Sequence, residues 1–370
     1  MTDVNQLAVP AVRELQAYPP GKPVEMLERE LGVSNAVKLA SNENPCGPSP
    51  KVVELLKSHM PDLARYPDGG GYYLRHALAE KHSLEASQVT LGNGSNDVLE
   101  MVARAFANHN HNIIFSEHAF AVYPIVTQAV GAQAKIVAAK NWGNDLEAIQ
   151  AAIDDATRVI FIANPNNPTG TWLTDVELKT FLDGVPDHVI VVLDEAYFEY
   201  AVDSRFGVEN YPDGSHWVNA YANLIVTRTF SKAYGLAGLR IGYGLSSAAI
   251  ANILDRVRQP FNVNTLALMA AETALQDDKH LQYACDINIS GMQQVTEKLK
   301  AMSLSYIPSI GNFLTINFDR PAAGLYEKLL HEGIIVRPVA NYAMPNHLRV
   351  TIGLPEENNR FLVALEKVLA

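Results

Sequence analysis

The sequence predicts an α/β protein, with a large domain built on a mainly parallel, helix-covered sheet and a smaller α+β domain at the C-terminus. Length is the first observation behind this prediction, because 370 residues correspond to about two or three domains. Composition is the second, since 48% hydrophobic and 19% charged residues provide an ample core and exclude disorder. The third is the alternation of short β-branched runs with helical patterns from about residue 52 to residue 264.

The expected strands of the large domain are apolar on both faces, as is typical of a parallel sheet that is covered on both sides. They occupy residues 88–92, 112–116, 134–139, 158–163, 188–194 and 223–229. Helical patterns lie between them at 95–107 and 145–153, and the first has apolar residues spaced to pack on the sheet. This order of strands and helices predicts repeated βαβ units.

The pattern changes after residue 264. Long helices are expected at 265–276 and 280–302, and strands at 313–318, 334–339 and 347–353, with helices between the strands. A last helix is expected to begin at Pro355, because proline in the first turn followed by two glutamates is a typical start signal. We expect an N-terminal segment (1–45), a large domain (46–264), and connecting helices with a small domain (265–370) that the N-terminal segment helps to complete.

Charge and cysteine content exclude several classes of protein. The chain has 29 lysines and arginines against 40 aspartates and glutamates, a net charge of −11, and no basic run, so nucleic acid is not an expected partner. Cys46 and Cys285 form no CxxC pair and the eleven histidines show no ligand spacing, so neither a disulfide scaffold nor a metal site is expected. No signal peptide or membrane span is expected either, which favours a cytoplasmic protein.

Polar loops follow four of the expected strands. They are GNGSND at 92–97, NPNNPTG at 164–170, DEAY at 194–197, and FSK at 230–232 with a glycine-rich stretch after it. Because ligands of open α/β sheets bind beyond the carboxyl ends of the strands, these loops predict one shared site. The glycine-rich turn at 92–94 opens a helix, which suits a phosphate, although Ser95 or Asn96 as a plain N-cap is the simpler interpretation of that loop alone.

Lys232 leaves a buried strand among hydroxyls and glycines. A surface lysine is the ordinary interpretation, but a lysine held in a partly dry site has a lowered pKa and can form a Schiff base with an aldehyde. The nearby hydroxyls and the guanidinium of Arg240 suit a phosphate carried by that aldehyde. These requirements describe pyridoxal 5′-phosphate.

Asp194 supports the same cofactor. A carboxylate directly after the apolar run 189–193 is costly to bury unless it is paired. Pairing with a protonated ring nitrogen lets the cofactor ring act as an electron sink, whereas a helix N-cap or a metal ligand is the alternative. Tyr197 and Asn167 are placed to hydrogen-bond the phenolic oxygen of the ring, although each taken alone is more often structural.

The NPNNPTG, DEAY and TFSKAYGLAGLRIGY segments resemble the class I and II aminotransferases, which are fold-type I enzymes that use pyridoxal phosphate. The resemblance extends over nearly the whole chain. The SNENPCGPSP, RYPDGGGY, GNGSND, FNVN and LRVTIG segments are similar to those of histidinol-phosphate aminotransferases within that family. This set of motifs is highly specific for fold and cofactor and less specific for the substrate.

The resemblance implies a role for each matching residue. Lys232 is implied to bind the cofactor and to move the proton, and Asp194 to face the ring nitrogen. Asn167 and Tyr197 are implied to hydrogen-bond the ring oxygen, and Tyr123 to stack on the ring. The phosphate cup is implied to consist of Ser95, Asn96, Thr229, Ser231 and Arg240. Tyr66 is implied to reach the cofactor phosphate of the neighbouring subunit in a homodimer. Arg349 is implied to hold the anionic end of the substrate, and the further substrate-side candidates are Arg337, Asn44 and Tyr18.

Each of these residues also has a structural interpretation. Tyr123 is equally consistent with core packing, and Tyr66 with an ordinary loop position. Arg349 lies on an expected strand, where a cross-strand ion pair is the usual role of an arginine. Arg337 either serves a substrate phosphate or flanks a strand.

The resemblance implies transfer of an amino group from histidinol phosphate to 2-oxoglutarate, since one arginine suits both a phosphate and a carboxylate. An aromatic amino-acid aminotransferase and a phosphothreonine-type decarboxylase are the alternatives on the same scaffold. A non-catalytic cofactor-binding module is a further alternative. It is disfavoured because the aminotransferase pattern starts within about forty residues and leaves no room for a separate DNA-binding domain of ordinary size.

Overall fold

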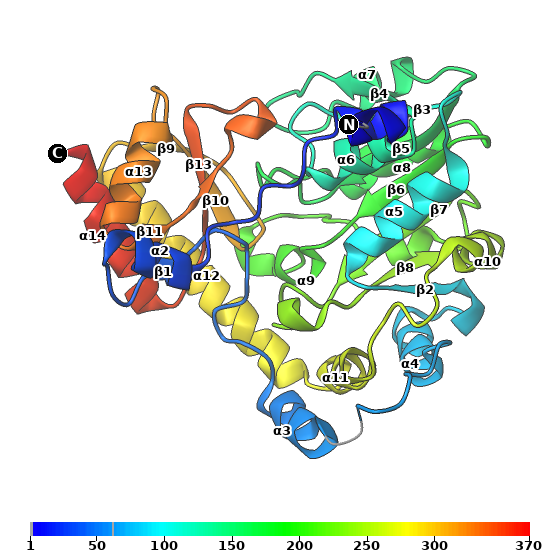
Figure 1. Cartoon of the computed structure of the whole chain (residues 1–370), viewed down its shortest axis with the longest axis horizontal. Helices are drawn as coiled ribbons and strands as arrows, with labels where there is room; N and C mark the ends of the chain where they lie inside the picture. Colours follow the sequence, from blue (N-terminus) through cyan, green and yellow to red (C-terminus); the bar gives the residue numbers. More distant parts are fainter. Residues whose placement is uncertain (1–2, 61–62) are drawn as a thin grey trace.

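The computed structural model describes residues 3–60 and 63–370 and shows a large α/β body with a smaller sheet-containing part beside it (Figure 1). The central sheet has the strand order β2-β8-β7-β6-β5-β3-β4. Its strands are β2 Val89–Gly92, β3 Asn112–Ser116, β4 Gln133–Val137, β5 Thr157–Ala163, β6 Ile190–Asp194, β7 Leu224–Thr229 and β8 Gly242–Ser246. Strands β4, β3, β5, β6 and β7 pair in parallel, while β8 runs antiparallel to both neighbours, which confirms the mainly parallel sheet.

Alternate residues of the strands enter two separate cores, because successive side chains of a strand point to opposite faces. Along β5, Val159 and Phe161 join one core while Ile160 and Ile162 join the other. The helices over the first core are α5 Ser95–Phe106, α6 Val122–Ala129 and α10 Ala248–Val257. Those over the second are α3 Pro50–His59, α4 Tyr72–His82, α7 Leu146–Ala151, α8 Asp175–Asp183 and α11 Thr265–Leu275.

The smaller part contains an antiparallel sheet of order β12-β13-β10-β9 with its own core. Its strands are β9 Ser305–Ile307, β10 Phe313–Asn317, β12 Arg337–Pro338 and β13 His347–Thr351, and its helices are α12 Asp278–Ala301, α13 Ala323–His331 and α14 Pro355–Leu369. The expected strand at 334–339 divides in two. Its first half, β11 (Ile334–Ile335), pairs with β1 (Val37–Lys38) and not with the antiparallel sheet.

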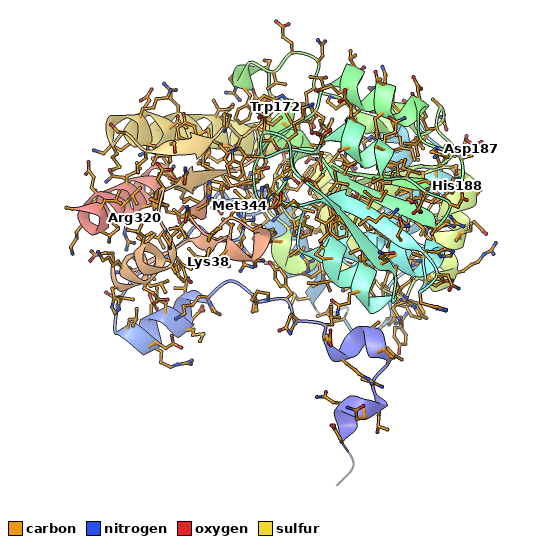
Figure 2. All side chains as sticks on the ribbon, turned by 90° about the horizontal axis from the view of Figure 1, so that it is seen from above. Lys38, Trp172, Asp187, His188, Arg320 and Met344 are labelled. Atoms are coloured by element: carbon orange, nitrogen blue, oxygen red, sulfur yellow. The ribbon has the colours of Figure 1, made fainter. Side chains whose placement is uncertain are left out.

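The N-terminal segment crosses from one part to the other. Its helices are α1 (Pro10–Arg13), which contacts α6, and α2 (Val24–Leu31), whose Leu27 packs with Leu330 and Ile335. Figure 2 shows the first helical turns standing out from the large body, and Lys38 of β1 lying with the smaller part. The pairing of β1 with β11 joins the N-terminal segment to the C-terminal part, whereas the expected boundaries at residues 45 and 264 stay predictions.

In the part of the chain that the structure describes, no helix is both long and apolar enough to cross a membrane. A further short helix of the large body, α9 (Phe198–Ala201), directly follows the loop after β6. That loop and the ends of β5 and β7 lie next to one another, because these strands are parallel neighbours of β6.

Candidate active site

A cavity of about 580 Å³ lies where β5, β6 and β7 end, between these strand ends and the smaller part. Most of the residues singled out in the sequence line it together. They are Tyr18, Ser95, Asn96, Asn167, Asp194, Tyr197, Thr229, Ser231, Lys232, Arg240, Arg337 and Arg349. The parallel order of the sheet brings these distant loops to one edge, as the strand-end argument predicts.

Asp194 ends β6 with a carboxylate that is only 4% exposed. Its two oxygens accept hydrogen bonds from different hydroxyls, Oδ2 from Tyr123 Oη at 2.8 Å and Oδ1 from Thr227 Oγ1 at 3.0 Å. Burial raises the pKa of the carboxyl, while the hydrogen bonds from Tyr123 and Thr227 act in the opposite direction. Both donors are neutral, so the negative charge of Asp194 faces the cavity without a strong ion pair.

The structure places Tyr123, the predicted stacking aromatic, outside the cavity lining. It is 1% exposed and stacks on Phe161 with ring centroids 4.7 Å apart. The aromatic side chain of the same segment that reaches the cavity is Phe120, which meets the Tyr123 ring edge-on. The difference arises because α6 begins at Val122, so that Tyr123 points inward toward the sheet.

Lys232 follows β7 by three residues and projects into the cavity. Its Nζ donates to the carbonyl of Ser41 at 3.1 Å and lies 5.7 Å from the centre of the Tyr197 ring. Burial lowers the pKa of Lys232 from 10.5 to about 7, and the charge of Arg349 adds to this effect. A large fraction of this amine is therefore neutral near pH 7 and able to attack an electrophile.

A cradle for an anion forms where α5 begins. Ser95 is the first residue of α5, and Gly94 before it has φ of 81°, so Ser95 is not the N-cap. Arg240 donates from Nη1 to Ser231 Oγ at 3.3 Å. A Cβ on Gly94 would lie 2.5 Å from Arg240 Nη2, so only glycine leaves room for the guanidinium here. Helix N–H groups, hydroxyls and a guanidinium together form the donor set that a phosphate requires.

Tyr197 and Asn167 line the cavity from the loops after the neighbouring strands β6 and β5. The Tyr197 hydroxyl accepts a hydrogen bond from Asn42 Nδ2 at 2.8 Å, and burial raises the pKa of Tyr197 to about 12. Asn167 Oδ1 accepts from Arg349 Nη1 at 2.5 Å. Both side chains are therefore held in fixed orientations and keep the protons that they need as hydrogen-bond donors.

Arg337 and Arg349 are direct partners across β12 and β13, and they are 7% and 6% exposed. Arg349 Nη2 donates to the carbonyl of Ala40 at 2.7 Å, while Nε is buried without a partner. Arg337 Nη2 donates to the carbonyl of Pro19 at 3.0 Å, and its guanidinium lies 5.4 Å from the ring centre of Tyr18. Two like charges opposite each other on one sheet face repel, so this arrangement favours an anion between them.

The cavity arginines differ from five arginines elsewhere in the described residues that have carboxylate partners. Those others are Arg75, Arg104, Arg205, Arg228 and Arg258. Within residues 3–60 and 63–370, Arg240, Arg337 and Arg349 form no ion pair, and burial lowers the pKa of Arg349. A cross-strand ion pair for Arg349, the structural alternative, is therefore absent from the described residues, and the two buried guanidiniums of Arg337 and Arg349 carry charge that a bound anion neutralises.

Two other predicted residues lie outside the cavity lining. Asn44 uses its side chain on the backbone, donating to the carbonyl of Ala233 at 2.8 Å and accepting from Cys46 N at 2.9 Å. We therefore assign it no substrate contact. Tyr66 is 83% exposed and stacks on Phe261, with ring centroids 4.7 Å apart.

Other residues of the site were not found from the sequence. Asn42 and the carbonyl of Ser41 reach Tyr197 and Lys232 from the N-terminal segment, and Thr227 binds Asp194 from within β7. Phe120 and Tyr342 also line the cavity. The SNEN segment at 41–44 carried the signal for Asn42, but only Asn44 was selected from it.

Comparisons with known proteins agree with this geometry. Residues 34–365 match the aminotransferase class I and II family. The chain is 60% identical over 370 residues to histidinol-phosphate aminotransferase 2 of Pseudomonas fluorescens strain Pf-5, which covers 100% of this chain and 99% of that relative. It is 57% identical over 372 residues to histidinol-phosphate aminotransferase 2 of Pseudomonas aeruginosa strain PAO1, which covers 100% of both chains.

The fold is also shared with solved structures. The crystal structure of histidinol-phosphate aminotransferase from Sinorhizobium meliloti in complex with pyridoxal-5′-phosphate matches with a TM-score of 0.89 at 27% identity, covering 98% of this chain and 97% of that chain. The match of the family over most of the sequence and the identity to full-length relatives lead to one conclusion. The chain belongs to the aminotransferase class I and II family.

Proposed function

We propose that this protein is a pyridoxal-phosphate-dependent aminotransferase that moves an amino group between histidinol phosphate and 2-oxoglutarate, giving imidazole-acetol phosphate and glutamate. The observation that carries the proposal is one cavity in which the amine of Lys232, with its pKa lowered to about 7, lies among three arginines without carboxylate partners. Such a cavity suits an aldehyde and two separate anions, one on the cofactor and one on the substrate.

The residues present fit the cofactor. Arg240 and the start of α5 form the cradle for its phosphate, whose remaining contacts we assign to Ser95, Asn96, Thr229 and Ser231. Asp194 is the buried carboxylate for the ring nitrogen. Tyr197 and Asn167 are the donors for the ring oxygen, and Phe120 replaces Tyr123 as the aromatic against the ring. When bound, this cofactor supplies an electron sink for the carbanion that forms at the substrate carbon.

Lys232 has two roles in this proposal. Its neutral amine binds the aldehyde, and once the substrate amine has displaced it, the same Nζ accepts and returns the proton of the substrate carbon. A general base works best when its pKa lies near the working pH, and burial places the pKa of Lys232 at about 7. The Ser41 carbonyl, 3.1 Å away, orients the amine.

Arg349 and Arg337 are assigned to the anionic end of the substrate. Histidinol phosphate has no α-carboxylate, so its phosphate takes the place of the glutamate carboxylate in the other half-reaction. A guanidinium accepts either anion because its planar fork suits both. Tyr18 lies on the Arg337 guanidinium at the mouth of the cavity, where it borders the substrate.

The names of the relatives support this substrate over the alternatives. Proteins 57% and 60% identical over their full length are histidinol-phosphate aminotransferases. An aromatic amino-acid aminotransferase that uses 2-oxoglutarate would also bind two anions, so the arginines alone do not separate it from the proposed enzyme, and the half-reactions below test it. The phosphothreonine-type decarboxylase stays an alternative that is tested by release of CO2 without a keto acid.

A homodimer with shared active sites stays part of the proposal. Tyr66 and Phe261 form an exposed aromatic pair, Tyr72 and Tyr73 are exposed as well, and we propose that a second copy of the chain covers them. In that dimer Tyr66 would reach the cofactor phosphate of the neighbouring subunit. The cytoplasmic location also stays a prediction.

The test is a set of half-reactions on the cofactor-loaded protein, followed by absorbance. Histidinol phosphate is compared with histidinol, which lacks only the phosphate, and with phenylalanine. We expect histidinol phosphate to convert the aldehyde form to the amine form at far lower concentration than either, and Lys232→Ala to abolish turnover. Preference for phenylalanine would move the substrate to aromatic amino acids, while conversion by none of the three would refute the aminotransferase assignment.

A further inference from the structure

The contact between Tyr123 and Asp194 is not explained by core packing alone. Tyr123 Oη lies 2.8 Å from Asp194 Oδ2, and the tyrosine is 1% exposed with its ring stacked on Phe161. A phenylalanine would give the same ring packing. The hydroxyl therefore has a separate role, which is its hydrogen bond to the carboxylate.

The hydroxyl can only donate in this contact. Burial raises the pKa of Tyr123 well above 10, and the neighbouring charge of Asp194 raises it further. The other oxygen of Asp194 accepts from Thr227 at 3.0 Å, so each carboxylate oxygen has a neutral hydroxyl donor. Two donors on two oxygens fix the plane of the carboxylate, and hydrogen bonds to the charged form favour that form.

We propose that Tyr123 is a positioning residue that acts through Asp194, holding its carboxylate ionised and oriented toward the protonated ring nitrogen of the cofactor. This inference rests on the proposed function, since it needs a cofactor with such a nitrogen. Tyr123 itself does not line the cavity, so it affects the cofactor through Asp194 and not by direct contact.

Other groups around Asp194 act differently. Lys232 is the charged group that faces it, and its charge lowers the pKa of the carboxyl, but a lysine that binds the aldehyde no longer carries that charge as a free amine. Tyr197 is a neutral phenol whose hydrogen-bond partner is Asn42. In the cofactor-loaded protein the two hydroxyl donors and the backbone N–H of Ala196 thus remain as the groups that oppose the effect of burial on Asp194, and the hydroxyls of Tyr123 and Thr227 are the side-chain donors among them.

The test compares Tyr123→Phe with Tyr243→Phe. Tyr243 is an equally buried tyrosine on β8, 1% exposed, whose hydroxyl binds His82 Nε2 at 3.1 Å and which lies outside the cavity lining. Both variants lose one buried hydroxyl. We expect Tyr123→Phe alone to weaken pyridoxal phosphate binding by about 10- to 100-fold, as measured by titration of the apoprotein.

A spectroscopic readout separates positioning from loss of structure. Without the Tyr123 hydroxyl, Asp194 stabilises the positive charge on the ring nitrogen less. A less positive ring withdraws fewer electrons from the imine nitrogen that joins Lys232 to the cofactor, so the pKa of that nitrogen rises. The pH midpoint of the absorbance change of the loaded protein should therefore move upward, by about one pH unit in Tyr123→Phe. The midpoint should not move in Tyr243→Phe. In Tyr123→Phe, kcat should fall by a larger factor than KM changes.

A double-mutant cycle with Asp194→Ala decides the route. If Tyr123 acts through the carboxylate, Tyr123→Phe has no further effect on cofactor affinity or on the pH midpoint in the Asp194→Ala background. Equal effects in both backgrounds, or a Tyr123→Phe protein that matches Tyr243→Phe, would overturn the inference and leave the aminotransferase assignment intact. A wild-type protein that binds no pyridoxal phosphate would overturn both.

Discussion

The pKa of Lys232 has a direct consequence for how the apoprotein captures its cofactor. An ordinary lysine with a pKa of 10.5 is neutral in roughly one molecule in 3,000 at pH 7, whereas a pKa of about 7 makes half of the molecules neutral. Only the neutral amine attacks the aldehyde. The rate of capture should therefore rise with pH around a midpoint near 7, level off above about pH 8, and fall as Lys232 becomes protonated below pH 6.

Stopped-flow absorbance from pH 5.5 to pH 9.5 measures this profile. The second pKa of a phosphate lies near 6, so pyridoxal without its phosphate is used as a second probe, and the midpoint near 7 should appear with both. Burial is the main cause of the lowered pKa and Arg349 the next. Arg349→Gln should therefore move the midpoint upward.

The matched control is Arg256→Gln, an exposed arginine of α10 that hydrogen-bonds Asn252. This change should leave the midpoint where it is in the wild type, and Lys232→Ala should remove covalent capture at every pH. A wild-type midpoint above pH 9 would refute the argument from burial. An Arg349→Gln profile that coincides with the Arg256→Gln profile would refute the contribution of the cavity charge.

Three further changes test other parts of the site. Arg337→Gln should raise KM for histidinol phosphate by about 10-fold or more, because a charged contact contributes about 1.5–3 kcal/mol. Gly94→Ala should weaken cofactor binding in equilibrium dialysis, since its Cβ would lie 2.5 Å from Arg240 Nη2. Arg228→Leu should lower the free energy of unfolding in urea by about 3–5 kcal/mol, because it leaves Glu195 buried and unpaired.

Each of these variants has a control in the chain. Arg360→Gln removes an exposed arginine that binds the carbonyl of Asn35, and it should not change KM. Gly238→Ala adds a Cβ with nothing within 4 Å, so cofactor affinity should stay the same. Arg104→Leu removes an exposed ion pair with Glu100, which contributes about 0–1 kcal/mol. An effect of equal size in a variant and its control would contradict the corresponding argument.

The buried parallel strands were predictable because their residues favour one structure in any context. The run 112–116 is β3 to the residue, and five other expected strands agree within two residues. Strand β8 was missed because Gly242 and Gly244 interrupt its apolar pattern. Those glycines are needed there, since a Cβ on Gly242 would lie 2.3 Å from Ser95 N. The requirement comes from a neighbour almost 150 residues away, which local propensity does not record.

In the site, too, residues placed by the local sequence pattern were predictable, and residues placed by contacts with distant parts of the chain were not. Residues that directly follow strands were predictable, because parallel strands deliver them to one edge. Asn42 was not, since it meets Tyr197 through a contact between residues 155 positions apart. Phe120 and Tyr123 could not be distinguished by sequence, because both are aromatic and only the start of α6 at Val122 decides which one faces the cavity.

The negative charge of Asp194 stays unpaired because the nearby buried arginine, Arg228, pairs with the next residue, Glu195. Adjacent strand residues point to opposite faces, so Glu195 meets Arg228 on the far side, at 2.7 Å, while Asp194 meets Thr227. Arg228 also binds Asp213, so its charge is fully used there. Had Arg228 faced Asp194, the carboxylate would already be paired and would have little reason to attract a protonated ring. Because the side-chain donors to Asp194 are neutral hydroxyls, its charge stays available for a cationic ligand in the cavity.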